Sequence, residues 1–324
     1  MKNDAMKNAL SGENERPLML APAFKDYIWG GERLKRDWGK RTDLSPLAES
    51  WELSCHEAGP SVVASGEWAG RTLAQVLAAH PQFVGTKAEK AGEFPLLIKL
   101  IDAAGPLSVQ VHPDDDYAER VEHALGKTEM WYVLDAGEGA GIYYGFRSKT
   151  TLKEMKAAIE SNTLTELLNW VPVKKGECFF IPAGTVHAIG AGLLIAEVQQ
   201  SSNLTYRVYD YGRLHIDKAL AVTRREPPQT PVGPTEPEQS VAGGSVQPLF
   251  ACDKFTTAVL TVEGTMSDSV SNESFVSLLT VEGEGTLSYR GETYPLKKGQ
   301  SVFLPAGMGT YELTGRMQVL RTRV

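Results

Sequence analysis

Two histidines, a glutamine and a glutamate stand where they could hold a metal ion. Gln110 and His112 are separated by one residue in the stretch SVQVHPDD, which predicts a short strand. Residues two apart on a strand point to the same face, so we expect both side chains to face one way. Glu129 and His187 lie on other predicted strands. Two imidazoles, a carboxylate and an amide oxygen form a donor set that suits Zn²⁺, which could act as a Lewis acid on a bound oxygen.

His187 follows a tight turn that occurs twice in the chain. Residues 173–184 read VKKGECFFIPAG, and residues 296–307 read LKKGQSVFLPAG. Each copy has the pattern of a strand that ends in a Pro-x-Gly turn. Thr310 takes the place of His187 in the second copy. The repeat therefore predicts two related β units, of which only the first has this histidine.

A second pair of similar segments precedes the turns. EMWYVLDAGEG begins at Glu129, and FVSLLTVEGEG begins at Phe275. In this alignment Phe275 stands where Glu129 stands in the first copy, so the carboxylate and the histidine are both absent from the second copy. We therefore expect the first unit to carry the metal site and the second to be structural.

The first turn also fits a known motif. Gly176, Pro182, Gly184 and His187 match the spacing G-x5-P-x-G-x2-H of the second cupin motif. The chain thus resembles the cupins, which are small double-stranded β-barrels with a metal site inside the mouth. This resemblance implies a mainly β fold: a double cupin of two jelly-roll-like β-barrels, with a short helical insertion in the first.

Composition shifts divide the chain into four parts. Residues 1–16 are polar, lack the apolar core of a signal peptide, and are expected to be disordered. Residues 17–224 are expected to form the catalytic, metal-binding cupin domain, with the helical insertion at about 150–170. Residues 225–248 hold six prolines and predict a linker. Residues 249–324 predict a degenerate C-terminal cupin barrel.

Net charge, hydropathy and cysteine content exclude some classes of partner and indicate the compartment. The 324 residues carry a net charge of −7 and no basic run, which argues against nucleic acid as a partner. No run of about 18 apolar residues occurs, which argues against a membrane partner. Cys55, Cys178 and Cys252 are widely spaced and odd in number, so we expect no disulfide framework and a cytoplasmic location. The oligomeric state is left open.

Seven blocks resemble the signatures of one enzyme family, the type I mannose-6-phosphate isomerases (phosphomannose isomerases) of the cupin superfamily, in their short bacterial form. The resemblance implies an aldose–ketose isomerase that interconverts mannose 6-phosphate and fructose 6-phosphate through an enediol, with one Zn²⁺ per chain. The blocks are KDYIWGG (25–31), ESWELSCH (49–56), PLLIKLIDA (95–103), LSVQVHPDD (107–115), GKTEMWYVLDA (126–136), IPAGTVHAIG (181–190) and EVQQSSNLTYRVYDYGR (197–213).

The resemblance also implies roles for individual residues. The metal ligands of the family fall on Gln110, His112, Glu129 and His187. Its catalytic residues fall on Arg207, Glu197 and Lys127, and its substrate-binding residues fall on Ser108, Lys99, Lys127 and Arg207.

Isomerisation through an enediol requires a base near C1 and C2 and an electrophile for the developing oxyanion. Glu197 is the candidate base, and the alternative is that Glu197 is only a structural or outer-shell carboxylate. Zinc and Arg207 could stabilise the oxyanion. Arg207 could instead share phosphate binding with Lys99 and Lys127, because a guanidinium pairs well with phosphate.

Two other functions fit the same motifs. The first is a catalytically inactive sugar-phosphate-binding cupin, which the retained ligands together with Arg207 and Glu197 argue against. The second is a cupin oxygenase. Ala191 stands where the cupin motif usually has Asn, and Glu129 lies well beyond His112. Both departures resemble the isomerase family and make the oxygenase less favoured.

Overall fold

The structure is a computed structural model that describes residues 15–89, 93–209, 214–229 and 232–324. It is mainly β, as predicted. Contacts divide the chain into two compact units that alternate along the sequence. The site unit comprises Phe24–Ser50 and Leu96–Gly233, and the C-terminal unit comprises Met1–Ala23, Trp51–Pro95 and Pro234–Val324.

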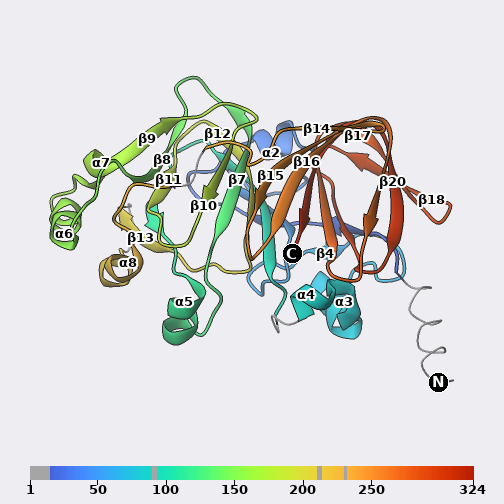
Figure 1. The fold of residues 1–324 in the computed structure, drawn as a ribbon, viewed down its shortest axis with the longest axis horizontal. Helices are drawn as coiled ribbons and strands as arrows, with labels where there is room; N and C mark the ends of the chain where they lie inside the picture. The colour runs from blue at the N-terminus through green and yellow to red at the C-terminus, as the bar shows by residue number, and fades with distance from the viewer. Residues whose placement is uncertain (1–14, 90–92, 210–213, 230–231) are drawn as a thin grey trace. The chain divides into compact units, whose positions relative to one another are not determined.

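Two antiparallel sheets build the site unit (Figure 1). Neighbouring strands of the six-stranded sheet are, in order, β10 (Cys178–Ile181), β7 (Glu129–Ala136), β12 (Leu193–Gln200), β5 (Leu96–Ala103), β3 (Glu49–Leu53) and β2 (Ala23–Lys25). Those of the five-stranded sheet are β13 (Tyr206–Tyr209), β6 (Val109–Val111), β11 (His187–Ile189), β8 (Gly141–Phe146) and β9 (Leu168–Pro172).

One apolar cluster joins the two sheets of the site unit. Trp131, Val133 and Phe179 of the first sheet belong to the same buried cluster as Ile142 and Ile189 of the second. Alternate residues of a strand face opposite sides of its sheet. The residues between these core residues therefore face away from the core. A polar residue two or four positions from a core residue on the same strand must face inward.

The short helical insertion is present in this unit. Thr151 is the N-cap of α6 (Leu152–Glu160), and its hydroxyl forms a capping box with the side chain of Glu154. α7 (Leu164–Leu167) follows, and the chain then becomes extended at Leu168, so the helical part ends before residue 170. Together with α8 (Ile216–Val222), these helices cover the outer face of the five-stranded sheet through a second apolar cluster. The described residues of this unit also form α2 (Arg33–Arg36) and α5 (Asp115–Glu122).

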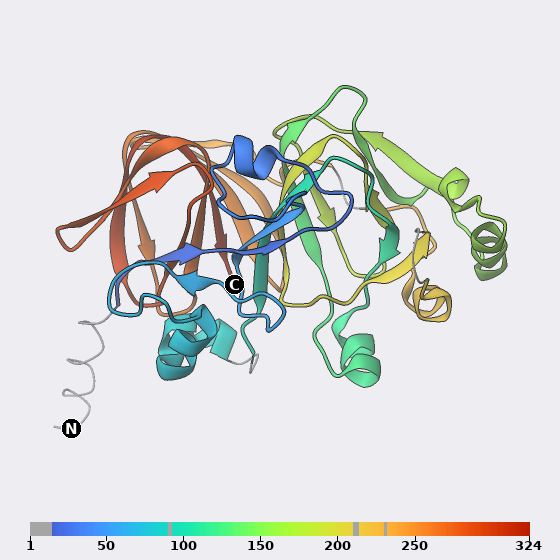
Figure 2. The same cartoon turned by 180° about the vertical axis from the view of Figure 1, so that it is seen from behind.

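A nine-stranded sheet forms most of the C-terminal unit, and its long strands, drawn in orange and red, are strongly curved (Figure 2). Its interior is apolar and includes Val276, Leu278 and Leu313. The helical elements α3 (Leu73–Ala79), η1 (Pro81–Val84) and α4 (Thr86–Glu89) belong to the same unit. The strand order is β14 (Gln239–Val241), β15 (Gly244–Ala251), β16 (Thr256–Val270), β20 (Gly309–Arg323), β17 (Val276–Tyr289), β19 (Ser301–Leu304), β1 (Leu18–Ala21) and β4 (Val62–Val63), with β18 (Glu292–Lys297) on β17.

Strands β14 and β15 overlap the predicted linker 225–248. β15 tolerates Pro248 because the pairing with β16 shifts register between Pro248 and Phe250, and a proline is accepted at such an irregularity. Of the predicted disordered segment 1–16, residues 1–14 lie outside the described residues, whereas Arg16 forms an ion pair with Glu292. The domain limits at 224 and 249 stay a prediction.

Within the described part of the chain, no helix has both the length and the apolar character needed to cross a membrane.

Candidate metal centre

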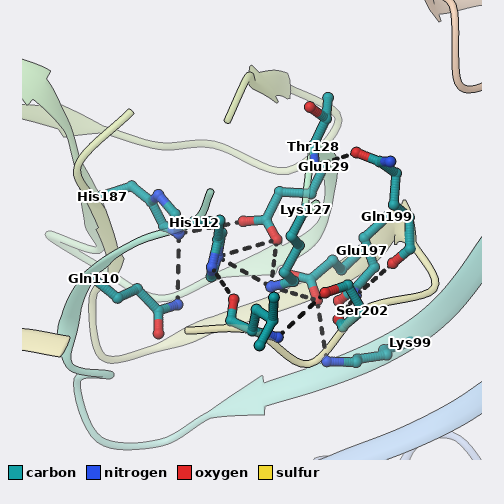
Figure 3. Close-up of polar contacts among 12 residues, drawn as sticks. Lys99, Gln110, His112, Lys127, Thr128, Glu129, His187, Glu197, Gln199 and Ser202 are labelled. Atoms are coloured by element: carbon teal, nitrogen blue, oxygen red, sulfur yellow. Dashed lines mark hydrogen bonds and ion pairs between the residues drawn. The ribbon is translucent and has the colours of Figure 1, made fainter. Parts of the chain in front are cut away.

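Three of the four predicted metal ligands meet in one buried cluster (Figure 3). One donor atom from each of His112, Glu129 and His187 lies within 4.8 Å of the others. Glu129 Oε2 is 3.6 Å from His112 Nε2, and Glu129 Oε1 is 3.3 Å from His187 Nε2. All three side chains are at most 1% exposed. Burying a carboxylate between two imidazoles is costly unless a positive charge compensates it.

Strand alternation explains why these side chains converge. Val109 and Val111 pack outward against the helical insertion, so Gln110 and His112 face the interior between the sheets. His187 lies opposite Gln110 in the pairing of β11 with β6. Glu129 begins β7 and faces inward because Trp131, two residues later, belongs to the inner core.

The two imidazoles are held so that Nε2 of each ring can bind a metal. His112 Nδ1 lies 2.8 Å from the carbonyl oxygen of Leu204, and His187 Nδ1 lies 2.8 Å from that of Thr185. A carbonyl only accepts, so each Nδ1 carries a proton that it donates, and each Nε2 keeps its lone pair. Burial lowers the pKa of His187 to about 4 and lowers that of His112 well below its usual range. Both rings are therefore neutral near pH 7, as metal ligands must be.

Glu129 also fits a cation site. Its Oε2 is paired with Lys127 Nζ at 2.6 Å, whereas Oε1 has no hydrogen-bond partner among the described residues. Burial raises the pKa of Glu129, and the charge of Glu197 raises it further, to about 7. A cation between the imidazoles and this carboxylate would favour the charged form, because an opposite charge lowers a carboxyl pKa. The donor set therefore fits a divalent metal ion.

Gln110, the fourth predicted ligand, stands beside the cluster. Its Nε2 is 3.5 Å from His187 Nε2. A half-turn of the terminal amide would bring Oε1 to that place, and the oxygen is the atom that coordinates a cation.

A cavity of about 750 Å³ lies next to the cluster. Gln110 and Lys127 line it, and each also contacts a member of the cluster. Ser108 and Arg207, both predicted from the sequence, line the same cavity. Arg207 is exposed and lies opposite Gln110 in the pairing of β13 with β6. The volume is within the range of small-molecule sites.

Three neighbouring strands place Lys99, Glu197 and Trp131 in one row. Glu197 on β12 lies directly opposite Lys99 on β5 and Trp131 on β7. Lys99 Nζ is 3.4 Å from Glu197 Oε1, Lys127 Nζ is 4.0 Å from the same oxygen, and Trp131 Nε1 donates to Oε2 at 2.9 Å.

The carboxylate of Glu197 stays charged although it is buried. Burial opposes the charge of Glu197, but Lys127 and Lys99 outweigh it and lower the pKa to about 2. Burial likewise opposes the charge of Lys99, but Glu49 and Glu197 raise its pKa. Both groups are therefore ionised at neutral pH, and Glu197 can accept a proton.

Sequence reasoning missed some residues of the site. Glu49 lies 3.7 Å from Lys99 Nζ and lines the cavity, as do Tyr27 and Trp29. These three belong to the blocks KDYIWGG and ESWELSCH, which carried the family resemblance but no assigned role. Trp131 lies in the block GKTEMWYVLDA, and only the sheet register reveals that it faces Glu197.

One alignment from the sequence is corrected by register. Ile181 pairs with Glu129 in the site unit, and the matching Leu304 pairs with Val276 in the C-terminal unit. The counterpart of Glu129 is therefore Val276, one residue after the predicted Phe275. Val276 belongs to the apolar core of its unit, so the carboxylate is replaced by a core side chain. Sequence similarity does not fix the register of a strand. An error of one residue places a side chain on the opposite face of the sheet.

Known proteins resemble this chain over nearly its whole length. Residues 18–139 match the family "Phosphomannose isomerase type I, catalytic domain", and residues 246–324 match "Mannose-6-phosphate isomerase, cupin domain". Mannose-6-phosphate isomerase ManA of Bacillus subtilis is 38% identical over 92% of this chain and 96% of its own. The mannose-6-phosphate isomerase of Streptococcus mutans is 36% identical over 94% of this chain and 97% of its own.

Solved structures agree with the sequence relatives. The crystal structure of the mannose 6-phosphate isomerase from Bacillus subtilis matches with a TM-score of 0.87 at 34% identity, covering 95% of this chain and 99% of that chain. A putative mannosephosphate isomerase from Archaeoglobus fulgidus matches with a TM-score of 0.79 at 26% identity, covering 96% and 99%.

Proposed function

The chain belongs to the type I mannose-6-phosphate isomerase family, and from that premise we propose that Gln110, His112, Glu129 and His187 hold one Zn²⁺ for its reaction. The protein is an aldose–ketose isomerase that interconverts mannose 6-phosphate and fructose 6-phosphate through an enediol. Relatives that carry this activity in their names match almost end to end, which favours the isomerase over an inactive sugar-phosphate-binding cupin or a cupin oxygenase.

One observation carries the metal assignment. Two imidazole Nε2 atoms whose Nδ1–H groups are tied to carbonyl oxygens face a buried carboxylate. Nitrogen and oxygen donors of this kind suit zinc, and they leave room for substrate in the coordination shell. When bound, Zn²⁺ would polarise a sugar oxygen as a Lewis acid.

Glu197 is the proposed base. Its low pKa keeps it charged, and Oε1 faces the two lysines at the cavity. In the aldose-to-ketose direction, the carboxylate takes the proton from C2 of mannose 6-phosphate. The C–H electron pair then forms the C1–C2 double bond, and the electron pair of the C1 carbonyl moves onto its oxygen. A proton passes from the O2 hydroxyl to this oxygen, and Glu197 returns its own proton to C1 as the C2–O2 bond becomes the ketone.

The cationic side chains have two proposed roles, which are stabilisation of the developing charge and binding of the phosphate. Lys99 and Lys127, both buried beside Glu197, counter the negative charge that develops on the sugar oxygens. Arg207 is exposed in the cavity wall, where its guanidinium can pair with the phosphate through two parallel hydrogen bonds. Ser108 lines the same cavity and is proposed to bind substrate with Arg207.

The proposed partner is thus a small sugar phosphate. The proposed compartment is the cytoplasm, on the basis of the three widely spaced cysteines.

A coupled assay tests this function. Purified protein is stripped with a chelator, reloaded with Zn²⁺, and supplied with mannose 6-phosphate while fructose 6-phosphate is detected. We expect no turnover after chelation and restored turnover with about one zinc per chain. Equal turnover with and without metal would contradict the metal assignment. No turnover by the zinc-loaded protein would contradict the isomerase function.

A further inference from the structure

Trp131 contacts two parts of the site at once. It lies on β7 two residues after Glu129, and its side chain is completely buried. Its indole Nε1–H donates to Glu197 Oε2 at 2.9 Å. Its ring also meets His187 edge to face, with 5.4 Å between ring centroids and an interplanar angle of 76°. One rigid side chain therefore touches the proposed base and a proposed metal ligand.

The hydrogen bond distinguishes the two oxygens of Glu197. Oε2 is held by Trp131 in the core, whereas Oε1 is directed toward Lys99 and Lys127 at the cavity. An indole N–H is a donor only and does not ionise, so it fixes the carboxylate without supplying a proton. A freely turning carboxylate would spend time with neither oxygen toward the substrate.

The contact with His187 sets the second constraint. His187 is held by Nδ1 at the Thr185 carbonyl and by the indole edge at its ring. Trp131 thus fixes the imidazole and the carboxylate relative to each other. Proton transfer depends steeply on such placement, and an error of about 1 Å can reduce a rate about 100-fold.

We propose that Trp131 is a positioning residue for the isomerisation, which holds Glu197 Oε1 in the orientation needed for proton transfer at the substrate carbon. This inference rests on the proposed role of Glu197. It concerns the orientation of the base, so metal retention and phosphate binding should not depend on the indole N–H.

The test is Trp131→Phe, with Trp68→Phe as the matched control. Trp68 is also largely buried, but it packs on His80 and Phe83 in the C-terminal unit. For Trp131→Phe we expect zinc content near one per chain, KM within about twofold of wild type, and kcat lower by about 10- to 100-fold. Trp68→Phe should keep the wild-type kcat. Loss of zinc, or an unchanged kcat, in Trp131→Phe would overturn the proposal.

Two further measurements separate orientation from folding. With mannose 6-phosphate deuterated at C2, the isotope effect on kcat should be larger in Trp131→Phe than in wild type, because proton transfer becomes slower relative to the other steps. Site-specific replacement of Trp131 by benzothienylalanine keeps the two-ring shape and removes only the N–H. A similar loss of kcat would support the proposal, and wild-type kcat would overturn it. If the wild-type enzyme itself fails to turn over, the proposed function fails instead.

Discussion

Lys99 and Glu197 are direct neighbours across β5 and β12, with Lys99 Nζ 3.4 Å from Glu197 Oε1. Both side chains are almost fully buried. In such surroundings a nearby cation keeps a carboxylate ionised, whereas burial alone would protonate it. The proposed base therefore depends on Lys127 and Lys99 for its charge.

Lys99→Met should shift the pH dependence of the reaction. Removing the cation disfavours the charged form of Glu197, so its pKa should rise from about 2. The acid limb of the kcat/KM profile should then move to higher pH, by about one unit or more. Steady-state rates after brief exposure to buffers between about pH 2 and pH 7, a range that begins at the wild-type pKa of Glu197, would measure it. Lys35→Met, at a surface pair with Glu32, should leave the profile unchanged. An unmoved acid limb in Lys99→Met would remove Lys99 from this role.

His187→Ala should lose both zinc and activity. The variant removes one of the two Nε2 donors of the cluster and leaves Glu129 without its partner at 3.3 Å. Metal content after dialysis and turnover of mannose 6-phosphate would be measured together. His123→Asn is the control, because His123 is exposed and has a positive φ of 54° that Asn accepts. Full activity in the metal-depleted His187→Ala protein would refute the ligand assignment.

Arg207→Ala should retain zinc but have a lower kcat/KM for mannose 6-phosphate. A lost hydrogen bond to a charged group costs about 1.5–3 kcal/mol, so kcat/KM should fall by about 10- to 100-fold. Arg207→Lys should recover only part of it, since an ammonium cannot form the paired hydrogen bonds. Arg120→Ala, at an exposed position on α5, is the control. An unchanged kcat/KM in Arg207→Ala would exclude Arg207 from the site.

Metal removal should lower thermal stability as well as activity. A ligand that binds only the folded state stabilises it by about 2.7 kcal/mol when present at 100 times its Kd. The melting temperature should therefore fall on chelation and recover when Zn²⁺ is added, as followed by calorimetry. In His187→Ala the same addition should produce a much smaller recovery. Equal melting temperatures for stripped and reloaded wild-type protein would contradict zinc binding at this site.

Leu278→Ala should destabilise the protein without emptying the metal site. Leu278 is 1% exposed in the core of the C-terminal unit, and such truncations cost about 2–5 kcal/mol. Chemical denaturation would give the change in unfolding free energy, and metal analysis of the folded fraction would give zinc content. Thr310→Ala, at an exposed position, should change stability little. Loss of zinc from folded Leu278→Ala would show that the C-terminal unit is not purely structural.

Much of the fold and part of the site could be predicted from local pattern. The two-residue spacing of Gln110 and His112 predicts one shared face; Gln110 lies opposite His187 in the pairing of β6 with β11, and His112, which directly follows β6, has its Nε2 3.6 Å from Glu129 Oε2. The capping residue Thr151 and the buried Met155 and Ile159 explain why a helical insertion was recognisable. Such signals lie within one element and need no knowledge of its neighbours.

The remainder depends on which strands lie next to one another. Trp131 and Glu197 are far apart in sequence, and only the pairing of β7 with β12 makes them neighbours. Glu49 joins the site through its proximity to Lys99, which no spacing in the sequence encodes. The single-residue error at Phe275 has the same origin, since register is set by the strands that flank β17.

The imidazoles of His112 and His187 are oriented by the peptide carbonyls of Leu204 and Thr185. No amino-acid exchange at positions 204 or 185 deletes a carbonyl. Those two positions can therefore accumulate mutations over evolutionary time without changing the orientation of the imidazole rings, provided that the main chain follows the same path. The orientation of these two proposed ligands therefore depends on the backbone conformation of two loops and not on the identity of the loop side chains.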